Sequence, residues 1–150
     1  MKISHIPDKF GIRERATEFP MMVVLSFVYV CNAQCPNCPY NNSDIRNAYK
    51  DMLFMSDAIF KRIADECGPY QSLLRLSGGG EPMLHPHAVE LAEYAKAKGC
   101  RIGLITNGSS FKGDQLRRLI KANVDALEFS VDAGTPEEYK FVRPGLDWKK

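Results

Sequence analysis

The chain has 150 residues, of which 45% are hydrophobic and 25% charged, and its formal net charge is +2. This length is enough for one domain with a sizeable core, and a charge so near neutral predicts neither nucleic acid nor a membrane surface as a partner. No apolar run approaches the roughly 18 residues of a membrane span. The first residues form no apolar signal region, so the expected location is cytoplasmic.

Residues 1–20 mix charges with Pro7 and Pro20 and show no clear period. We expect them to form an irregular lead-in with a short helix near residues 12–18, followed by one core over residues 21–150. The core opens on an almost wholly apolar run, Met21 to Val30. Such a run, rich in β-branched and aromatic residues, predicts a strand buried on both faces, as in a parallel sheet.

Three of the five cysteines follow this strand, within the segment Cys31-Asn32-Ala33-Gln34-Cys35-Pro36-Asn37-Cys38. Three soft thiolates at the spacing C-x3-C-x2-C suit an iron–sulfur cluster or zinc. A disulfide framework is less consistent with such bunching, which in a reducing compartment favours metal binding. Because Pro36 and Pro39 oppose a regular helix, we expect a loop that wraps around the metal.

The number of nearby thiols leaves two interpretations open. A ferredoxin-type cluster and a structural zinc site each take four protein ligands, whereas this segment supplies three. Three thiolates on a cubane would leave one iron open to a substrate or cofactor. The alternative is zinc with a distant fourth ligand, such as Cys67, Cys100 or His85.

The next segments alternate between loop, helix and strand. The polar stretch from Tyr40 to Lys50 is expected to be a loop over the mouth of the site. Ser56 is a plausible N-cap for a helix to Cys67. Five residues recur on one face of that helix, and these are Ile59, Phe60, Ile63, Ala64 and Cys67.

A predicted strand over residues 72–76 leads into Ser77-Gly78-Gly79-Gly80-Glu81-Pro82. A glycine-rich turn after a strand lets the backbone approach a ligand closely. The turn matches neither the phosphate-binding loop nor the dinucleotide fingerprint, which counts against another nucleotide as the ligand. Taken alone, it is also compatible with a tight turn that carries a solvated glutamate.

The second half of the core repeats the alternation. Helices are predicted over residues 87–98 and 114–122, the latter with Leu116, Leu119 and Ile120 inward, and strands over residues 101–105 and 126–131. Alternation at this rhythm predicts a parallel sheet with right-handed crossovers. The polar groups that follow each strand therefore meet at one mouth, as in barrels.

Several of these polar groups are candidates for a ligand site. Thr106-Asn107-Gly108 ends the third strand, and its Asn-Gly pair is also a plain turn signal. Ser130 and Asp132 fall two apart in the fourth strand and are expected to share a face. Thr135-Pro136-Glu137-Glu138 predicts a capping box at the start of a last helix, and Arg143 lies beyond that helix.

Together these motifs resemble the radical S-adenosylmethionine (radical SAM) superfamily. The resemblance covers about residues 21–143, and the cysteine motif, Gly79-Gly80-Glu81-Pro82, Thr106-Asn107-Gly108 and Ser130-Val131-Asp132 occur in the family's order. It implies that Cys31, Cys35 and Cys38 hold a [4Fe-4S] cluster. It also implies that S-adenosylmethionine chelates the fourth iron and is cleaved to a 5′-deoxyadenosyl radical that abstracts hydrogen from substrate.

The resemblance also assigns residues to S-adenosylmethionine. Gly79, Gly80 and Glu81 would bind the methionine amino group, and Thr106 and Asn107 would line the nucleoside. The residue before the third cysteine is commonly aromatic in the family. Here it is Asn37, and Tyr40 is a possible substitute or a tyrosine packed on the rim.

Three further residues are assigned by the same resemblance. Ser130 would hold the cofactor carboxylate. Asp132 would hold a ribose hydroxyl or a substrate group. Arg143 would reach the methionine carboxylate or the cluster, although an exposed arginine before a proline is nearly as compatible with the sequence.

The resemblance sets expectations for the whole protein. Radical SAM cores usually have six strands, so four imply a partial TIM-type (β/α) barrel, truncated on the C-terminal side. The expected partners are an electron donor such as flavodoxin or ferredoxin and an unidentified substrate. A peptide or cofactor precursor would suit the branch with SPASM-type extensions. The alternative is a non-catalytic zinc or iron–sulfur binding module.

Overall fold

A computed structural model describes residues 19–149 of the chain; the helix expected near residues 12–18 lies outside this part. Four strands form one sheet in the order β1-β2-β3-β4, and each is parallel to its neighbour. They are β1 (Met22–Ser26), β2 (Leu73–Ser77), β3 (Arg101–Thr106) and β4 (Ala126–Phe129). The parallel α/β sheet with four strands expected from the sequence is thus confirmed.

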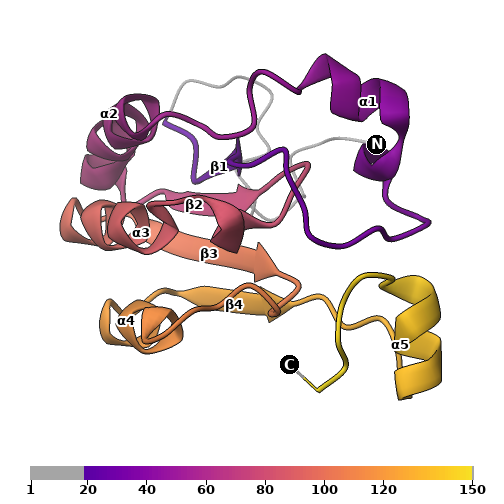
Figure 1. The fold of residues 1–150 in the computed structure, drawn as a ribbon. Coiled ribbons are helices and arrows are strands. Elements are labelled where there is room, and N and C mark those ends of the chain that lie inside the picture. The colour runs from indigo at the N-terminus through magenta and orange to yellow at the C-terminus, as the bar shows by residue number, and fades with distance from the viewer. Residues whose placement is uncertain (1–18, 150) are drawn as a thin grey trace, which may run out of the picture.

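Among residues 19–149, five α-helices accompany the sheet in two groups (Figure 1). Those that connect successive strands form a row along the sheet, and they are α2 (Asp57–Cys67), α3 (Ala88–Ala97) and α4 (Gln115–Lys121). The other two, α1 (Ser43–Ala48) and α5 (Pro136–Val142), lie at the end of the sheet to which the strands point. The described part of the chain also contains short 3-10 helices, namely η3 (Pro39–Asn41), η4 (Gly68–Tyr70) and η5 (Pro82–Leu84).

The core lies between the sheet and the connecting helices. Leu74 and Leu76 of β2 and Ile102 of β3 are at most 2% exposed, and they belong to one apolar cluster with Phe60 and Leu91 of the helices. Because side chains alternate along a strand, the intervening residues face the other side of the sheet. No helix among residues 19–149 is long and apolar enough to cross a membrane.

The first strand is shorter and more exposed than the sequence predicted. β1 ends at Ser26, after which Val28 forms an isolated antiparallel bridge with Phe54. Val24 is 58% exposed, so the expectation of a strand buried on both faces is wrong. β1 has only β2 beside it in the described sheet, and an edge position leaves part of its surface uncovered.

The segment from Tyr40 to Lys50, predicted as a loop, contains η3 and α1. The side chain of Asn42 accepts hydrogen bonds from the backbone N–H groups of Asp44 and Ile45, which is how an N-cap begins a helix. Helix α1 has no buried residue. The segment therefore lacks the apolar period by which a helix is normally identified.

The predicted faces of two helices are correct only in part. Phe60, Ala64 and Cys67 of α2 are buried as expected, whereas Ile59 is 56% exposed. In α4 only Leu119 is buried, and Ile120 is 63% exposed. A seven-residue helix at the rim of the sheet presents too narrow a contact to cover a wide apolar stripe.

Candidate functional site

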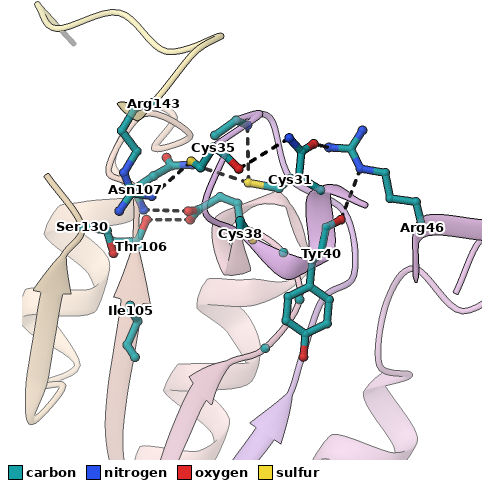
Figure 2. A pocket seen from close by; sticks show the side chains of 16 residues that line it. Cys31, Cys35, Cys38, Tyr40, Arg46, Ile105, Thr106, Asn107, Ser130 and Arg143 are labelled. Carbon is teal, nitrogen blue, oxygen red and sulfur yellow. Dashed lines mark hydrogen bonds between the residues drawn. The ribbon is translucent and has the colours of Figure 1, made fainter. Parts of the chain in front are cut away.

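The loop of three cysteines lies at the end of the sheet where the parallel strands finish, beside a cavity lined by the segments that follow all four strands (Figure 2). The cavity is lined by every site residue predicted from the sequence except Asp132. Its lining comprises Cys31, Ala33, Cys35, Cys38, Tyr40, Asn41, Arg46, Gly78, Gly79, Gly80, Glu81, Ile105, Thr106, Asn107, Ser130 and Arg143.

The three cysteines are free thiols and are partly exposed. Two N–H donors approach their sulfur atoms closely: Ala33 N lies 3.4 Å from the sulfur of Cys31, and Arg143 Nη1 lies 3.5 Å from that of Cys35. Burial raises the pKa of the Cys31 thiol, and the nearby Glu81 carboxylate adds to this while the Ala33 N–H opposes it. Metal coordination would deprotonate such a thiol.

The three thiols and the N–H groups beside them are chemically suited to an iron–sulfur cluster. In the part of the chain that the structure describes, no three Cys, His, Asp or Glu side chains gather as ligands of one ion. Zinc needs sulfur ligands about 2.3 Å from one centre, whereas the three thiolates of a [4Fe-4S] cubane each bind a different iron. Backbone and side-chain N–H groups beside the sulfurs are the kind of outer contact that iron–sulfur sites use.

The distant ligands considered for zinc are occupied elsewhere. His85 is buried, with Nε2 2.8 Å from the carbonyl oxygen of Met55 and Nδ1 accepting from His87 N at 3.1 Å. Cys100 is 1% exposed and its thiol donates to Ala64 O. Cys67 is buried on α2 in the apolar core. None of these three residues lines the cavity beside the cysteine loop, so the structure places none of them as a fourth ligand there.

The glycine turn after β2 is packed too tightly for any side chain. A Cβ on Gly80 would lie 2.2 Å from the carbonyl oxygen of Val30, and one on Gly79 would lie 2.5 Å from the ring of Tyr40. Because the backbone N–H of Glu81 also donates to Val30 O at 2.8 Å, this turn lies directly against the strand end that carries the cysteines. Its small residues keep the backbone accessible to a ligand.

Glu81 joins two strand ends inside the site. Glu81 is only 2% exposed. Its carboxylate accepts hydrogen bonds from Thr106 Oγ1 at 2.6 Å, Asn107 N at 2.7 Å and Met83 N at 3.1 Å. A buried carboxylate with three donors is well satisfied. The structure thus gives Glu81 a role in holding the ends of β2 and β3 together.

A side-chain ring that the sequence did not reveal fastens the cysteine loop to the end of β3. Asn107 Nδ2 donates to Asn32 Oδ1 at 2.9 Å, Asn32 Nδ2 donates to Ser109 Oγ at 2.7 Å, and Ser109 Oγ donates to Asn107 Oδ1 at 2.8 Å. Asn32 lies within the cysteine motif and Ser109 follows the Asn-Gly turn. Only their sequence positions beside these motifs could have suggested them.

The end of the fourth strand differs from the prediction. β4 stops at Phe129, so Ser130 and Asp132 do not share a strand face. Ser130 lines the cavity, whereas Asp132 has φ +57° and pairs with Arg143 outside the lining. Aspartate tolerates this left-handed conformation better than most residues, and the turn it makes redirects the chain toward α5.

Aromatic residues flank the cavity on the side of β1. Asn37, where relatives of the expected family commonly have an aromatic residue, is exposed and does not line the cavity. Tyr40 does line it, and its ring lies 6.0 Å from that of Tyr29. Tyr29 in turn stacks on Tyr49 at 3.9 Å, so Tyr40 is supported by a small aromatic group.

Comparison with known proteins agrees with this geometry. Mycofactocin maturase MftC of Mycobacterium tuberculosis is 28% identical over 93% of this chain and 34% of its own length. GTP 3′,8-cyclase of Chlorobaculum tepidum is 30% identical over 89% of this chain and 38% of its own. The chain thus spans about a third of the length of the curated relatives it matches.

A solved structure supports the fold. BtrN, crystallised in an open conformation, superposes with a TM-score of 0.64 at 17% identity, over 82% of this chain and 55% of that one. The sequence profile of the Radical SAM superfamily matches residues 25–150, which is most of the chain. The chain therefore belongs to the radical SAM superfamily.

Proposed function

We propose that the chain is the core of a radical SAM enzyme, with Cys31, Cys35 and Cys38 holding a [4Fe-4S] cluster. When bound, the reduced cluster with S-adenosylmethionine on its open iron supplies a 5′-deoxyadenosyl radical that abstracts hydrogen from a substrate. The observation that carries the proposal is the meeting of the three thiols with Gly79, Gly80 and the ends of β3 and β4 around one cavity.

The other predicted residues would bind S-adenosylmethionine around the cluster. The backbone of Gly79 and Gly80, with Glu81 beneath it, would receive the methionine ammonium, and Ser130 and Arg143 would receive its carboxylate. The Nε of Arg143 is buried and has no hydrogen-bond partner among residues 19–149, so it is the guanidinium donor that would meet this carboxylate. Thr106 and Asn107 line the cavity and would border the nucleoside, with Thr106 Oγ1 donating to Glu81 and the Asn107 side chain bonded to Asn32 and Ser109.

The aromatic group beside Gly79 would complete the site. Tyr40 lines the cavity and would offer its ring to the adenine in place of the aromatic residue that Asn37 replaces in the cysteine motif. Aromatic faces stack favourably on such rings.

The whole protein would need a low-potential electron donor, such as a flavodoxin or ferredoxin, and a substrate. Relatives named as a maturase, a heme synthase and a GTP cyclase support a peptide or a cofactor precursor as the substrate class.

Anaerobic reconstitution with iron and sulfide tests the proposal. The reduced protein should show a [4Fe-4S] EPR signal that changes when S-adenosylmethionine is added. Single Cys→Ala changes at Cys31, Cys35 or Cys38 should abolish the signal, and Cys67→Ala, in the apolar core, should retain it. Stable zinc in place of iron, or a spectrum indifferent to S-adenosylmethionine, would contradict the proposal.

A further inference from the structure

Arg143 connects the cysteine loop to the turn after β4. It is the C-cap residue of α5, where its backbone N–H donates to Tyr139 O at 2.7 Å. From there its side chain, only 16% exposed, reaches the cavity (Figure 2). Pro144 O accepts from Gln34 N at 2.9 Å, so the same turn holds the cysteine loop at a second point.

The three nitrogens of the guanidinium have different surroundings. Nη1 donates to the sulfur of Cys35 at 3.5 Å, and Nη2 donates to the carboxylate of Asp132. Nε is buried and has no hydrogen-bond partner among residues 19–149. One cation therefore touches a cysteine sulfur, is held by a carboxylate, and leaves one donor for an acceptor in the cavity.

We propose that Arg143, oriented by Asp132, raises the reduction potential of the cluster through its contact with Cys35, an inference that rests on the proposed function. The relevant step is a one-electron reduction from [4Fe-4S]2+ to [4Fe-4S]+ by a low-potential donor. It adds one negative charge beside the guanidinium. An N–H donor and a positive charge at a cluster thiolate stabilise the more negative, reduced state.

Asp132 is a positioning residue in this account. Its φ of +57° directs the chain so that the carboxylate meets Nη2, and the pair fixes the guanidinium with Nη1 toward Cys35. A second group, Tyr139, is 7% exposed on α5 and fixes the backbone from which Arg143 extends. The Asp132 carboxylate is negative, so its own electric field would oppose reduction of the cluster. Its ion pair with Arg143 would favour reduction, because it keeps the guanidinium beside Cys35.

These two effects of Asp132 have opposite signs, and potentiometric EPR titration of the reconstituted full chain separates them. The titration is carried out without S-adenosylmethionine. Arg143→Gln should make reduction of the cluster about tenfold less favourable, which lowers the midpoint potential of this one-electron couple by about 59 mV. The midpoint potential of Arg143→Lys should lie between those of Arg143→Gln and the wild type, because lysine keeps the positive charge but lacks the planar guanidinium.

Asp132→Gly removes the carboxylate and suits the positive φ. If Asp132 positions Arg143, the cluster potential in Asp132→Gly should fall toward the value in Arg143→Gln. The double variant should then have nearly the same potential as Arg143→Gln alone. A rise in potential would show that the field of the carboxylate outweighs its hold on Arg143 and would overturn the proposal that Asp132 acts mainly by positioning. Arg75→Gln is the matched control, because Arg75 also pairs with a carboxylate, Glu128, but touches no cysteine.

The outcomes distinguish the two proposals. A wild-type chain that assembles no cluster would refute the proposed function. A cluster that forms and responds to S-adenosylmethionine, with the same potential in wild type, Arg143→Gln and Arg143→Lys, would refute only the present inference. If Arg143→Gln loses iron, the midpoint potentials of Arg143→Lys and Asp132→Gly are compared with that of the wild type. Potentials below the wild-type value would support the inference, and unchanged potentials would refute it.

Discussion

At the scale of single residues, Glu81 shows how a motif residue can serve structure and ligand together. The family resemblance assigns it to the ammonium of S-adenosylmethionine, yet its two oxygens already accept three hydrogen bonds in the folded chain. A buried group of this kind is costly to leave half satisfied. Its contribution to stability is therefore separable from its contribution to binding.

Glu81→Gln should destabilise the metal-free chain by about 1–3 kcal/mol, the usual cost of leaving buried hydrogen-bonding groups unsatisfied. The new amide N–H₂ would face either Thr106 and Met83 or the backbone N–H of Asn107, all of which donate to Glu81 now. Urea unfolding measures the change. Thr106→Val should act in the same direction, because Gly108 N also loses an acceptor.

Glu128→Gln is the control for this experiment, since Glu128 pairs with Arg75 at the exposed surface of the sheet. Surface ion pairs of this type contribute about 0–1 kcal/mol. An unchanged urea midpoint in Glu81→Gln would show that the carboxylate serves only the ligand.

At the scale of elements, the helices are placed by a few polar contacts at their ends. Thr135 Oγ1 accepts from Glu138 N at 3.3 Å, and the carboxylate of Glu138 accepts from Thr135 N at 3.1 Å, so the capping box predicted for α5 is confirmed. Helix α5 has one buried residue, Tyr139. The hydrogen bonds at its ends therefore contribute more to its stability than its packing does.

Thr135→Ala should cost about 1 kcal/mol of stability, which is typical for loss of an N-cap. Because Arg143 is the residue that closes α5, the change should also increase hydrogen exchange at the amide of Arg143. Glu137→Gln, in the same first turn but outside the capping box, should increase exchange less, because it removes only a charge near the helix N-terminus. Equal protection in Thr135→Ala and wild type would mean that tertiary contacts alone hold the helix.

Another polar contact joins α3, β3 and the start of β4. Asp125 Oδ2 accepts from Lys96 Nζ and from Ile102 N, both at 2.7 Å. Burial raises the pKa of Asp125, but these two hydrogen bonds outweigh it, and the pKa lies below its usual value. An aspartate with a lowered pKa in the folded state stabilises the fold above the unfolded pKa, about 3.9.

The stabilisation from Asp125 should therefore be complete at neutral pH and be lost as the pH falls below about 4, through the folded pKa. Asp125→Asn should lower stability at pH 7 by ~1 kcal/mol, because the pair is partly exposed, and should flatten the acid limb of the stability curve. Urea unfolding at several pH values checks both effects. Asp51→Asn, at an exposed turn position, should reproduce the wild-type curve; a wild-type acid limb in Asp125→Asn would refute the prediction.

The elements also show which parts of the fold local sequence can reveal. The helix from Ser56 to Cys67 was predicted because an N-cap, an apolar period and a Gly-Pro stop agree, and the structure has it with Ser56 as cap. Helix α1 was missed because its signal is confined to Asn42. The exposure of Val24 depends on strand order, which no local pattern encodes.

At the scale of the whole molecule, parallel topology explains why the convergence of the predicted residues on one cavity could be expected from the sequence. Carboxyl ends of parallel strands meet at one edge, so motifs 20 to 50 residues apart converge, roughly at the spacing of βα units. The ring of Asn32, Asn107 and Ser109 could not be foreseen. It depends on side-chain geometry between two loops that only the assembled sheet brings together.

The same topology leaves β4 at the rim of the described sheet with an apolar border. Phe129 is 51% exposed, Val131 45% and Phe141 77%. A strand edge with free backbone groups beside apolar side chains is a template for pairing with another chain. We therefore expect the 150-residue chain to self-associate as its concentration rises, through the β4 border.

Sedimentation velocity over a concentration series measures this association. The double variant Phe129→Lys with Val131→Lys should weaken it by about tenfold or more, because each large apolar side chain buried contributes about 1.5–3 kcal/mol and 1.4 kcal/mol is a factor of ten. Ile59→Lys is the control, as Ile59 is 56% exposed on α2, at the side of the sheet opposite to β4 (Figure 1). Equal weakening by both changes would point to general apolar exposure, whereas an effect confined to Phe129 and Val131 assigns the association to the β4 edge.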